Sequence, residues 1–385
     1  MYRILLFSDL HIGSIKEITH VYDTLTRILD TELVYRKSDA IIILGDFFHK
    51  LLRVNEEHTT LAINIMSYLV RLCKKNKTKI RLLYGTESHE ASSYTLFNYH
   101  LTDPDLDMKL VTTVSVEELF PKVNILYVPE EYVESKEEHY RKYLDKKYTY
   151  IFGHGIISEG MPMIGLENTS VQERKLPRFK VGELSQASTL TVFGHYHKFT
   201  ELPGNVYYLG SLFRDSFGEE EPKGYGIVEG NKLTFIENPD AYIYKTYEYP
   251  ADSDIYTSTA NLLAEINKIK MENEEIFTEN RYGKIRVIFN LPADINSSFS
   301  ENLRLLLMKE KNIRYIYKEA SSIPEDLSAE IQVEYDFILD DSLSVWEKIC
   351  RYIDKNFPGS DLDLAEIIKL TNERLEIYRN EGKGP

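Results

Sequence analysis

Short, continuous apolar runs in the first half of the chain constrain its fold more than any other feature. They lie at residues 3–8, 40–45, 79–84, 148–153 and 189–194. Runs of this length that are rich in β-branched residues are typical of sheet strands covered on both faces. Between the early runs, residues 17–37 and 56–76 carry apolar side chains at intervals of three and four, which indicates helices. The alternation of the two patterns predicts an α/β fold.

From about residue 205 the pattern changes to short strand-like pieces separated by Gly, Pro and Asn. These pieces lie at 205–209, 224–229, 232–237 and 242–249. They predict a meander that completes a second sheet of the first domain, which we place at residues 1–250.

Two further regions follow the first domain. Residues 251–320 are expected to form a small α+β domain. Its predicted elements are helices near 256–272 and 298–309 and strands at 283–290 and 313–318. Residues 321–385 are expected to be an acidic linker followed by two amphipathic helices, near 342–356 and 361–379.

The chain is acidic, with 46 Lys and Arg against 61 Asp and Glu among 385 residues and a net charge of −15. Residues 321–385 alone hold 15 acidic and 7 basic residues. This net negative charge argues against a protein that binds duplex DNA by neutralising its phosphates alone. A nucleic-acid substrate would therefore require bound cations and a partner to supply positive charge.

Neither a membrane span nor a thiolate metal site is expected. No apolar run approaches the ~18 residues that a membrane helix requires, and the start MYRILLFSDLH lacks the features of a signal peptide. We expect a soluble protein of the cytoplasm, near the nucleoid or, for a viral chain, in the host cytoplasm. Cys73 and Cys350 lie far apart in sequence, so a bound metal would be held by nitrogen and oxygen.

Carboxylate and imidazole side chains follow the five apolar runs. They are Asp9, His11, Asp46, His49, His89, His154, His195 and His197. Because the carboxyl ends of parallel strands lie along one edge of a sheet, these side chains are expected to converge. A single Asp-x-His sequence after a strand would more often contain a buried or solvated histidine than a metal ligand. The recurrence of such residues at five strand ends favours a metal centre. Carboxylates and imidazoles without a thiolate suit Mn, Fe or Zn better than Ca, and a shared carboxylate would let two ions activate a hydroxide.

Glycine precedes three of these side chains. Gly45, Gly153 and Gly194 each stand directly before one of them. Glycine adopts backbone conformations that other residues avoid, so we expect each to permit a sharp turn that aims the next side chain across the sheet edge.

Five short motifs resemble those of the calcineurin-like metallophosphoesterases. They are Asp9-x-His11, Gly45-Asp46-x-x-His49, Gly85…His89-Glu90, Gly153-His154 and Gly194-His195-x-His197. The segment LGSLFRDSFGEEEPKGYG at 209–226 resembles the one that closes the catalytic domain of SbcD-type DNA double-strand-break nucleases. These are relatives of the meiotic-recombination Mre nuclease and include bacteriophage recombination nuclease subunits. The resemblance implies a two-sheet sandwich flanked by helices, a DNA-binding capping domain at 251–320 and a C-terminal segment that binds a partner.

The resemblance also implies roles for the convergent residues. It places two divalent cations, Mn²⁺ in the first instance with Mg²⁺ or another transition metal as alternatives, on two sets of ligands. One set is Asp9, His11, Asp46 and His197, and the other is Asp46, His154 and His195. Asp46 would be shared, while His49 and His89 would lie over the scissile phosphate as transition-state stabiliser and general acid.

The third motif departs from the family pattern. Where the family has Gly-Asn-His-Asp, this chain has GTESHE at 85–90, which is two residues longer and lacks the Asn ligand. Glu87 is the better oxygen donor and is the expected replacement, with Ser88 as the alternative. Glu90 replaces the Asp that normally orients the catalytic His.

Two further sets of residues are expected to bind macromolecules. Arg174, Lys175, Arg178 and Lys180 are expected to contact DNA phosphates, the alternative being a solvated basic loop. In the family, C-terminal helices hold an SbcC-type SMC-like ATPase, and here the apolar side chains for that contact are Leu343, Trp346, Ile353, Ile367 and Leu375. The alternative is packing of these helices on the parent domain.

The leading hypothesis is a Mn-dependent DNA nuclease, a double-strand exonuclease and single-strand endonuclease. It would process DNA ends in recombination and repair as a homodimer within a heterotetramer with the ATPase. One alternative is a phosphatase or small-molecule phosphodiesterase of the same superfamily, which would have no need of residues 251–385. Another is a non-catalytic scaffold, suggested only by the altered third motif.

Overall fold

The computed structural model describes residues 2–15, 17–53, 55–90, 92–158, 176–277, 282–292 and 312–319. The chain divides into two compact units. The larger unit consists of Met1–Phe289 and Asn296–Tyr317 and contains nearly all of the described residues. The other unit consists of Asn290–Ile295 and Lys318–Pro385, of which 290–292 and 318–319 are described.

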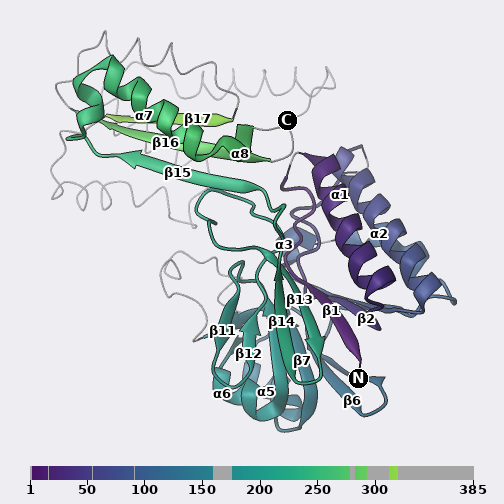
Figure 1. Cartoon of the computed structure of the whole chain (residues 1–385). Helices are drawn as coiled ribbons and strands as arrows, with labels where there is room; N and C mark the ends of the chain where they lie inside the picture. The colour runs from purple at the N-terminus through teal and green to yellow at the C-terminus, as the bar shows by residue number, and fades with distance from the viewer. Residues whose placement is uncertain are drawn as a thin grey trace, which may run out of the picture. The chain divides into compact units, whose positions relative to one another are not determined.

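Two six-stranded sheets form the centre of the larger unit (Figure 1). The first sheet has the order β14-β13-β1-β2-β3-β4. Its strands are β1 (Arg3–Phe7), β2 (Ala40–Ile43), β3 (Lys79–Leu83), β4 (Met108–Val111), β13 (Gly224–Glu229) and β14 (Lys232–Glu237). Strands β1 to β4 run parallel, whereas β13 pairs antiparallel with β1.

The second sheet has the order β11-β12-β10-β7-β6-β5. Its strands are β5 (Ser115–Phe120), β6 (Val123–Val128), β7 (Tyr148–His154), β10 (Ser188–Gly194), β11 (Thr200–Leu202) and β12 (Val206–Tyr208). The central strands β6, β7, β10 and β12 are parallel, and the two outer strands are antiparallel to their neighbours.

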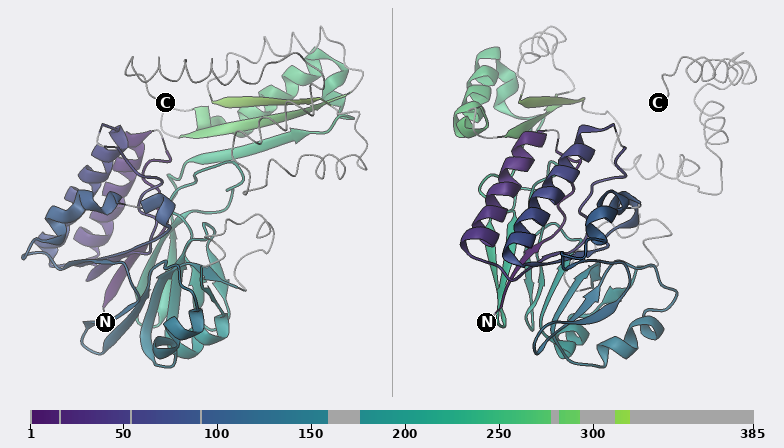
Figure 2. Two further views of the ribbon diagram at one scale, coloured as in Figure 1. Left: turned by 180° about the vertical axis from the view of Figure 1, so that it is seen from behind. Right: turned by 90° about the vertical axis from the view of Figure 1, so that its right-hand side faces the viewer.

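The sheets pack face to face and helices cover their outer faces, as the views in Figures 1 and 2 show. Alternate side chains of β1 explain the layers: Ile4 and Leu6 pack against the second sheet, while Leu5 and Phe7 pack against helices α1 (Ile18–Leu29) and α2 (Glu57–Asn76). Helices α5 (Lys136–Leu144) and α6 (Val181–Ala187) pack on the other face of the second sheet. The mixed α/β sandwich with flanking helices confirms the predicted fold class.

A smaller sheet follows, in which β15 (Ile243–Tyr249) pairs in parallel with β16 (Gly283–Leu291) and β17 (Ile313–Glu319) lies beyond β16. Helix α7 (Thr259–Glu272) buries Leu262, Ile266 and Ile269. The remaining short elements are α3 (Glu87–Glu90), a 3₁₀ helix (Ser93–Phe97), α4 (Asn98–Leu101), the strand pair β8 (Ile156–Ile157) and β9 (Arg178–Phe179), a 3₁₀ helix (Asp254–Thr257) and α8 (Glu274–Phe277).

The five strands predicted from apolar runs are confirmed as β1, β2, β3, β7 and β10. The two early helices are also confirmed, although the first continues as a π-helical segment, Asp30–Tyr35. Strands β4, β5 and β6 were not predicted.

The predicted meander is wrong as a single unit. Strand β12 joins the second sheet, β13 and β14 join the first sheet, and β15 joins the small sheet, which therefore begins ahead of the domain boundary expected at residue 250. The predicted helices near 298–309, 342–356 and 361–379 lie outside the described residues.

Among the described residues, none of the helices combines the length and apolar character needed to cross a bilayer.

Candidate metal centre

Strand ends from both sheets bring the candidate ligands together. Asp9 and His11 follow β1, Asp46 follows β2, His154 ends β7, and His195 directly follows β10. The backbone N–H of His195 donates a hydrogen bond to the Asp9 carboxylate at 3.1 Å, and Nδ1 of His154 lies 2.6 Å from the carbonyl oxygen of Leu44. These bonds join the two sheets at the site.

The backbone at four candidate ligands has a positive φ. The values are 50° at Asp9, 44° at His11, 49° at Asp46 and 88° at His195. Such conformations cost non-glycine residues on the order of 1–3 kcal/mol each and persist where the surrounding structure enforces them. Their concentration here indicates that packing aims these side chains inward at some cost in stability.

The glycines before the ligands serve two different purposes. Gly45 has φ 85° and makes the predicted turn, and a Cβ at this position would collide with the ring of His154. A Cβ at Gly153 would strike the ring of Phe193, and one at Gly194 would strike Ser8 and the carbonyl oxygen of Leu44. Gly153 and Gly194 are therefore required by close packing, and the expectation of a sharp turn holds only for Gly45.

Asp9, His11 and His197 form one group of potential ligands, whose donor atoms all lie within 4.8 Å of one another. The Nε2 atoms of His11 and His197 are 3.0 Å apart. Nε2 of His197 also lies 3.8 Å from Oδ1 of Asp9. Two imidazole nitrogens and a carboxylate thus face one small space.

Glu130, His154 and His195 form a second group of the same kind. Oε2 of Glu130 lies 3.4 Å from Nδ1 of His195 and 3.8 Å from Nε2 of His154. The two groups meet at Asp46, whose Oδ2 is 3.7 Å from Nε2 of His11 and 3.5 Å from Nε2 of His154. Asp46 is therefore placed between the groups.

The two imidazoles of the first group have pKa values shifted in opposite directions. Burial lowers the pKa of His11 to about 3 despite the nearby carboxylates, so this ring is neutral. Burial alone would also lower the pKa of His197, but its bond to Glu219 and the charges of Asp9, Glu219 and Asp215 raise it to about 9. At neutral pH the charged His197 can donate through Nε2 to the neutral His11.

The buried groups around Asp46 stabilise its ionised form. Burial favours the neutral carboxyl, but His154 and His11 outweigh it and hold the pKa of Asp46 well below its usual range. Burial likewise favours neutral His154, but the charges of Asp46, Asp9 and Glu130 raise the pKa of His154 well above its ordinary value. Cationic charge at this point is therefore stabilised by carboxylates.

A carboxylate outside the first group fixes the orientation of His197. Nδ1 of His197 lies 3.1 Å from Oε1 of Glu219, so Nε2 is left facing Asp9. The other oxygen of Glu219 is 2.9 Å from the ammonium of Lys223, which is buried and also donates to the carbonyl oxygen of His197. Carboxylate partners of this kind are usual behind histidine ligands. Glu219 and Lys223 both belong to the segment 209–226, which resembles the nuclease segment described above.

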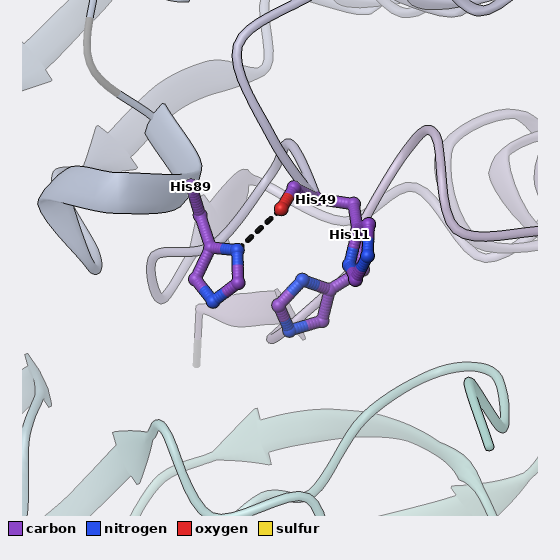
Figure 3. Close-up of side chains that lie close together, drawn as sticks. All are labelled: His11, His49 and His89. Carbon is purple, nitrogen blue, oxygen red and sulfur yellow. Dashed lines mark hydrogen bonds between the residues drawn. The ribbon is translucent and has the colours of Figure 1, made fainter. Parts of the chain in front are cut away.

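Three imidazoles, those of His11, His49 and His89, lie side by side at the edge of the first group (Figure 3). The ring centroids of His11 and His89 are 4.9 Å apart, and those of His49 and His89 are 5.7 Å apart. Nδ1 of His89 is hydrogen-bonded to the carbonyl oxygen of His49, as Figure 3 shows, so Nε2 is the ring nitrogen of His89 that lies outside this bond.

Glu90 does not have the role expected from the resemblance. Its carboxylate accepts hydrogen bonds from the N–H of Phe47 at 2.7 Å, the N–H of Gly85 at 2.5 Å and the hydroxyl of Tyr94 at 2.7 Å. It therefore ties together the loops after β2 and β3, and the carbonyl oxygen of His49 instead holds His89.

Three of the remaining predicted residues, Glu87, Arg178 and Lys180, lie in the described part of the chain. Glu87 begins α3 but belongs to none of the potential ligand groups in the described part of the chain. Arg178 pairs with Ile156 in the β8–β9 ladder, and Lys180 precedes α6. The other predicted contact residues lie outside the described residues. They are Arg174, Lys175, Leu343, Trp346, Ile353, Ile367 and Leu375.

Sequence reasoning missed Glu130. It follows the apolar run VNILYV of β6 at the same kind of strand end as the other candidates. The rule that found Asp46 and His154 would have found Glu130 had this run been recognised as a strand. Asp215 and Glu219, which join His197 in a further group, follow no predicted strand; they stand in the segment 209–226, which the resemblance singled out without giving either residue a role.

The donor set fits two divalent cations. It offers imidazole nitrogens and carboxylate oxygens and contains no thiolate, as expected for Mn, Fe or Zn. Nε2 of His154 is buried and has no hydrogen-bond partner among the described residues, although it faces the carboxylates of Asp46 and Glu130. A metal ion bound between these carboxylates would satisfy this nitrogen.

No protein-family model and no curated protein matches the chain. One solved crystal structure aligns with 61% of this chain and 98% of its own, at 10% identity and a TM-score of 0.36. A dimetal phosphatase from Danio rerio aligns over 54% of this chain and 74% of its own, at 10% identity and a TM-score of 0.25. At these scores neither similarity adds to the description of the fold or the site.

Proposed function

We propose that the chain is a metal-dependent phosphoesterase, and specifically a DNA nuclease that uses two divalent cations, with Mn²⁺ as the preferred ion. The observation that carries the proposal is the position of Asp46 between two groups of imidazole and carboxylate ligands, next to the imidazoles of His49 and His89. Two cations bound there would supply an activated hydroxide and neutralise charge on a phosphoryl group.

The chain's own residues divide the remaining work. Asp9, His11 and His197 would hold one ion and His154 and His195 the other, with Asp46 between them. His89 keeps Nδ1 bonded to the carbonyl oxygen of His49, which leaves Nε2 to deliver a proton to the leaving oxygen. The pKa of His49 is lowered by burial and by His89, so this ring is neutral near pH 7 and can donate a hydrogen bond to a phosphate oxygen.

Cationic and aromatic side chains beside the metal centre favour a nucleic-acid substrate. A cavity of about 450 Å³ is lined by Asp215 of the site together with Phe217, Tyr244, Lys284 and Arg314. Rings that can stack on bases and cations that can meet phosphates are the combination used to hold single strands. A small phosphomonoester would not need it.

The proposed partner is an SbcC-type SMC-like ATPase, with the chain as a homodimer in a heterotetramer that processes DNA ends. This part of the proposal rests on the segment 209–226 and on the apolar pattern of the C-terminal helices. Co-purification of Trp346→Ala and wild-type protein with the ATPase tests it. We expect the variant to bind more weakly and to keep Mn-dependent cleavage of single-stranded DNA.

The direct test of the proposed function compares substrates. Purified protein is incubated with Mn²⁺ and end-labelled duplex DNA, circular single-stranded DNA, bis-p-nitrophenyl phosphate or p-nitrophenyl phosphate. We expect cleavage of both DNAs and of the diester, and its loss in His89→Ala. Hydrolysis of the monoester with intact DNA would favour the phosphatase alternative, and absence of any hydrolysis would favour the scaffold.

A further inference from the structure

Glu130 occupies a position where no ligand was expected. It lies beyond the end of β6, and its backbone N–H donates to the carbonyl oxygen of Tyr84, at the end of β3, at 2.9 Å. The residue is 4% exposed, so its carboxylate is removed from bulk water. A buried carboxylate requires a cation or several hydrogen-bond donors.

The carboxylate of Glu130 points into the second ligand group. Oε2 lies 3.4 Å from Nδ1 of His195 and 3.8 Å from Nε2 of His154. Oε1 accepts a bond of 3.3 Å from the hydroxyl of Tyr132, whereas Oε2 faces the two imidazoles and the hydroxyl of Thr86. Nε2 of His154 has no hydrogen-bond partner among the described residues, so Glu130 approaches this nitrogen without bonding to it.

Thr86 of the altered third motif contacts both Asp46 and Glu130. Thr86 follows Gly85, where the motif of the similar family has Asn, and its N–H donates to Oδ1 of Asp46 at 2.6 Å. The Thr86 hydroxyl lies 3.2 Å from Oδ2 of Asp46 and 3.4 Å from Oε2 of Glu130. The short Thr side chain thus supports both carboxylates, and Glu130 occupies the space beside it.

We propose that Glu130 is the ligand that completes the second metal site. The inference rests on the proposed two-metal function and changes the set of donor atoms at the second metal site. Each ion then has the same donors: two imidazoles, one carboxylate of its own and the shared Asp46. A carboxylate in place of a neutral amide also lowers the formal charge of the loaded centre by one unit and favours harder ions such as Mn²⁺.

Mn²⁺ binding to three Glu→Gln variants tests the assignment without relying on activity. Glu130→Gln removes the proposed ligand, and Glu87→Gln removes the ligand expected from the sequence. Glu131→Gln is the matched control, because the Glu131 carboxylate accepts bonds from the N–H of Val114 at 3.0 Å and the hydroxyl of Tyr140 at 3.1 Å. Bound Mn²⁺ is counted by equilibrium dialysis, and circular dichroism confirms that each variant is folded.

We expect two ions per chain in the wild type, Glu87→Gln and Glu131→Gln. Glu130→Gln should keep one ion and bind the other at least ~10- to 100-fold more weakly, the range seen even for residues that only support ligands. Glu130→Asp keeps a carboxylate and should fall between the wild type and Glu130→Gln, which serves as the test if Glu130→Gln does not fold.

Two results would overturn the assignment and differ from failure of the proposed function. Two ions at wild-type affinity in Glu130→Gln, or loss of one ion in Glu87→Gln alone, would remove Glu130 as a ligand while leaving the two-metal centre intact. A wild-type chain that binds fewer than two ions would contradict both the assignment and the proposed function.

Discussion

Metal affinity at the site that includes His197 should depend steeply on pH. The pKa of His197 is raised to about 9, chiefly by Glu219 against the opposing effect of burial. Since a raised pKa means that the ring holds its proton throughout the neutral range, an ion must displace that proton from Nε2. Raising the pH removes the proton, so affinity should increase with pH up to about 9.

The magnitude follows from the proton competition. For a pKa of about 9 the apparent affinity rises roughly 10-fold per pH unit, which gives ~30-fold between pH 6.5 and 8.0. An imidazole with an ordinary pKa would give only ~2-fold over the same range. Isothermal titration calorimetry with Mn²⁺, in two buffers of different ionisation enthalpy, measures both the affinity and the protons released.

Glu219→Gln is the informative variant, because glutamine can still accept from Nδ1 of His197 but carries no charge. The pKa of His197 should fall, and the pH dependence of the affected ion should become shallower. The other ion should keep its wild-type pH dependence, since the pKa of His154 is raised by Asp46, Asp9 and Glu130. A ~2-fold change in the wild type, or equal slopes in the wild type and Glu219→Gln, would refute the reasoning.

Three further predictions concern catalysis, the core and the glycines. His89→Ala should lower the rate of phosphodiester cleavage by ~10²–10⁴ and leave two Mn²⁺ bound, because His89 is assigned to proton transfer; loss of an ion would assign it to a metal instead. Ile42→Ala, between the two sheets, should lower the free energy of unfolding measured in urea by about 2–5 kcal/mol and leave the Mn²⁺ stoichiometry unchanged. A decrease below ~1 kcal/mol would mean that the sheets pack loosely there. Gly194→Ala should weaken Mn²⁺ binding as well as stability, since its Cβ would strike Ser8 and Leu44 at the site; wild-type dialysis results would contradict this close packing.

Much of the sandwich could be predicted because its central strands are buried on both faces. The runs that became β1 and β2 hold four successive apolar residues, 4–7 and 40–43, so they stand out without knowledge of their neighbours. The first four residues of strand β5 (SVEELF) alternate half-buried and exposed, only the last two are buried, and the strand carries two glutamates, which conceals it. The pairing of β13 with β1, such as Ile227 opposite Leu5, is a long-range contact that no local pattern specifies.

The candidate site could be predicted where candidate ligands follow recognisable strands. Asp9, Asp46 and His154 stand at such ends, and the structure brings them together. Glu130 was not predicted as a ligand because its strand was not recognised. The departure in the third motif led to the prediction of Glu87 instead. The positive φ angles at Asp9 and Asp46 could not be predicted, because packing between the sheets imposes them against the residues' own preference.

Electron paramagnetic resonance of the Mn²⁺-loaded protein tests the two-metal centre most directly. If Asp46 joins two ions, the wild type with two equivalents of Mn²⁺ should give the multiline signal of a spin-coupled pair. Asp46→Asn should lose that coupling and show the six-line signal of isolated Mn²⁺. Isolated six-line signals from the wild type at two equivalents would contradict a centre built around Asp46.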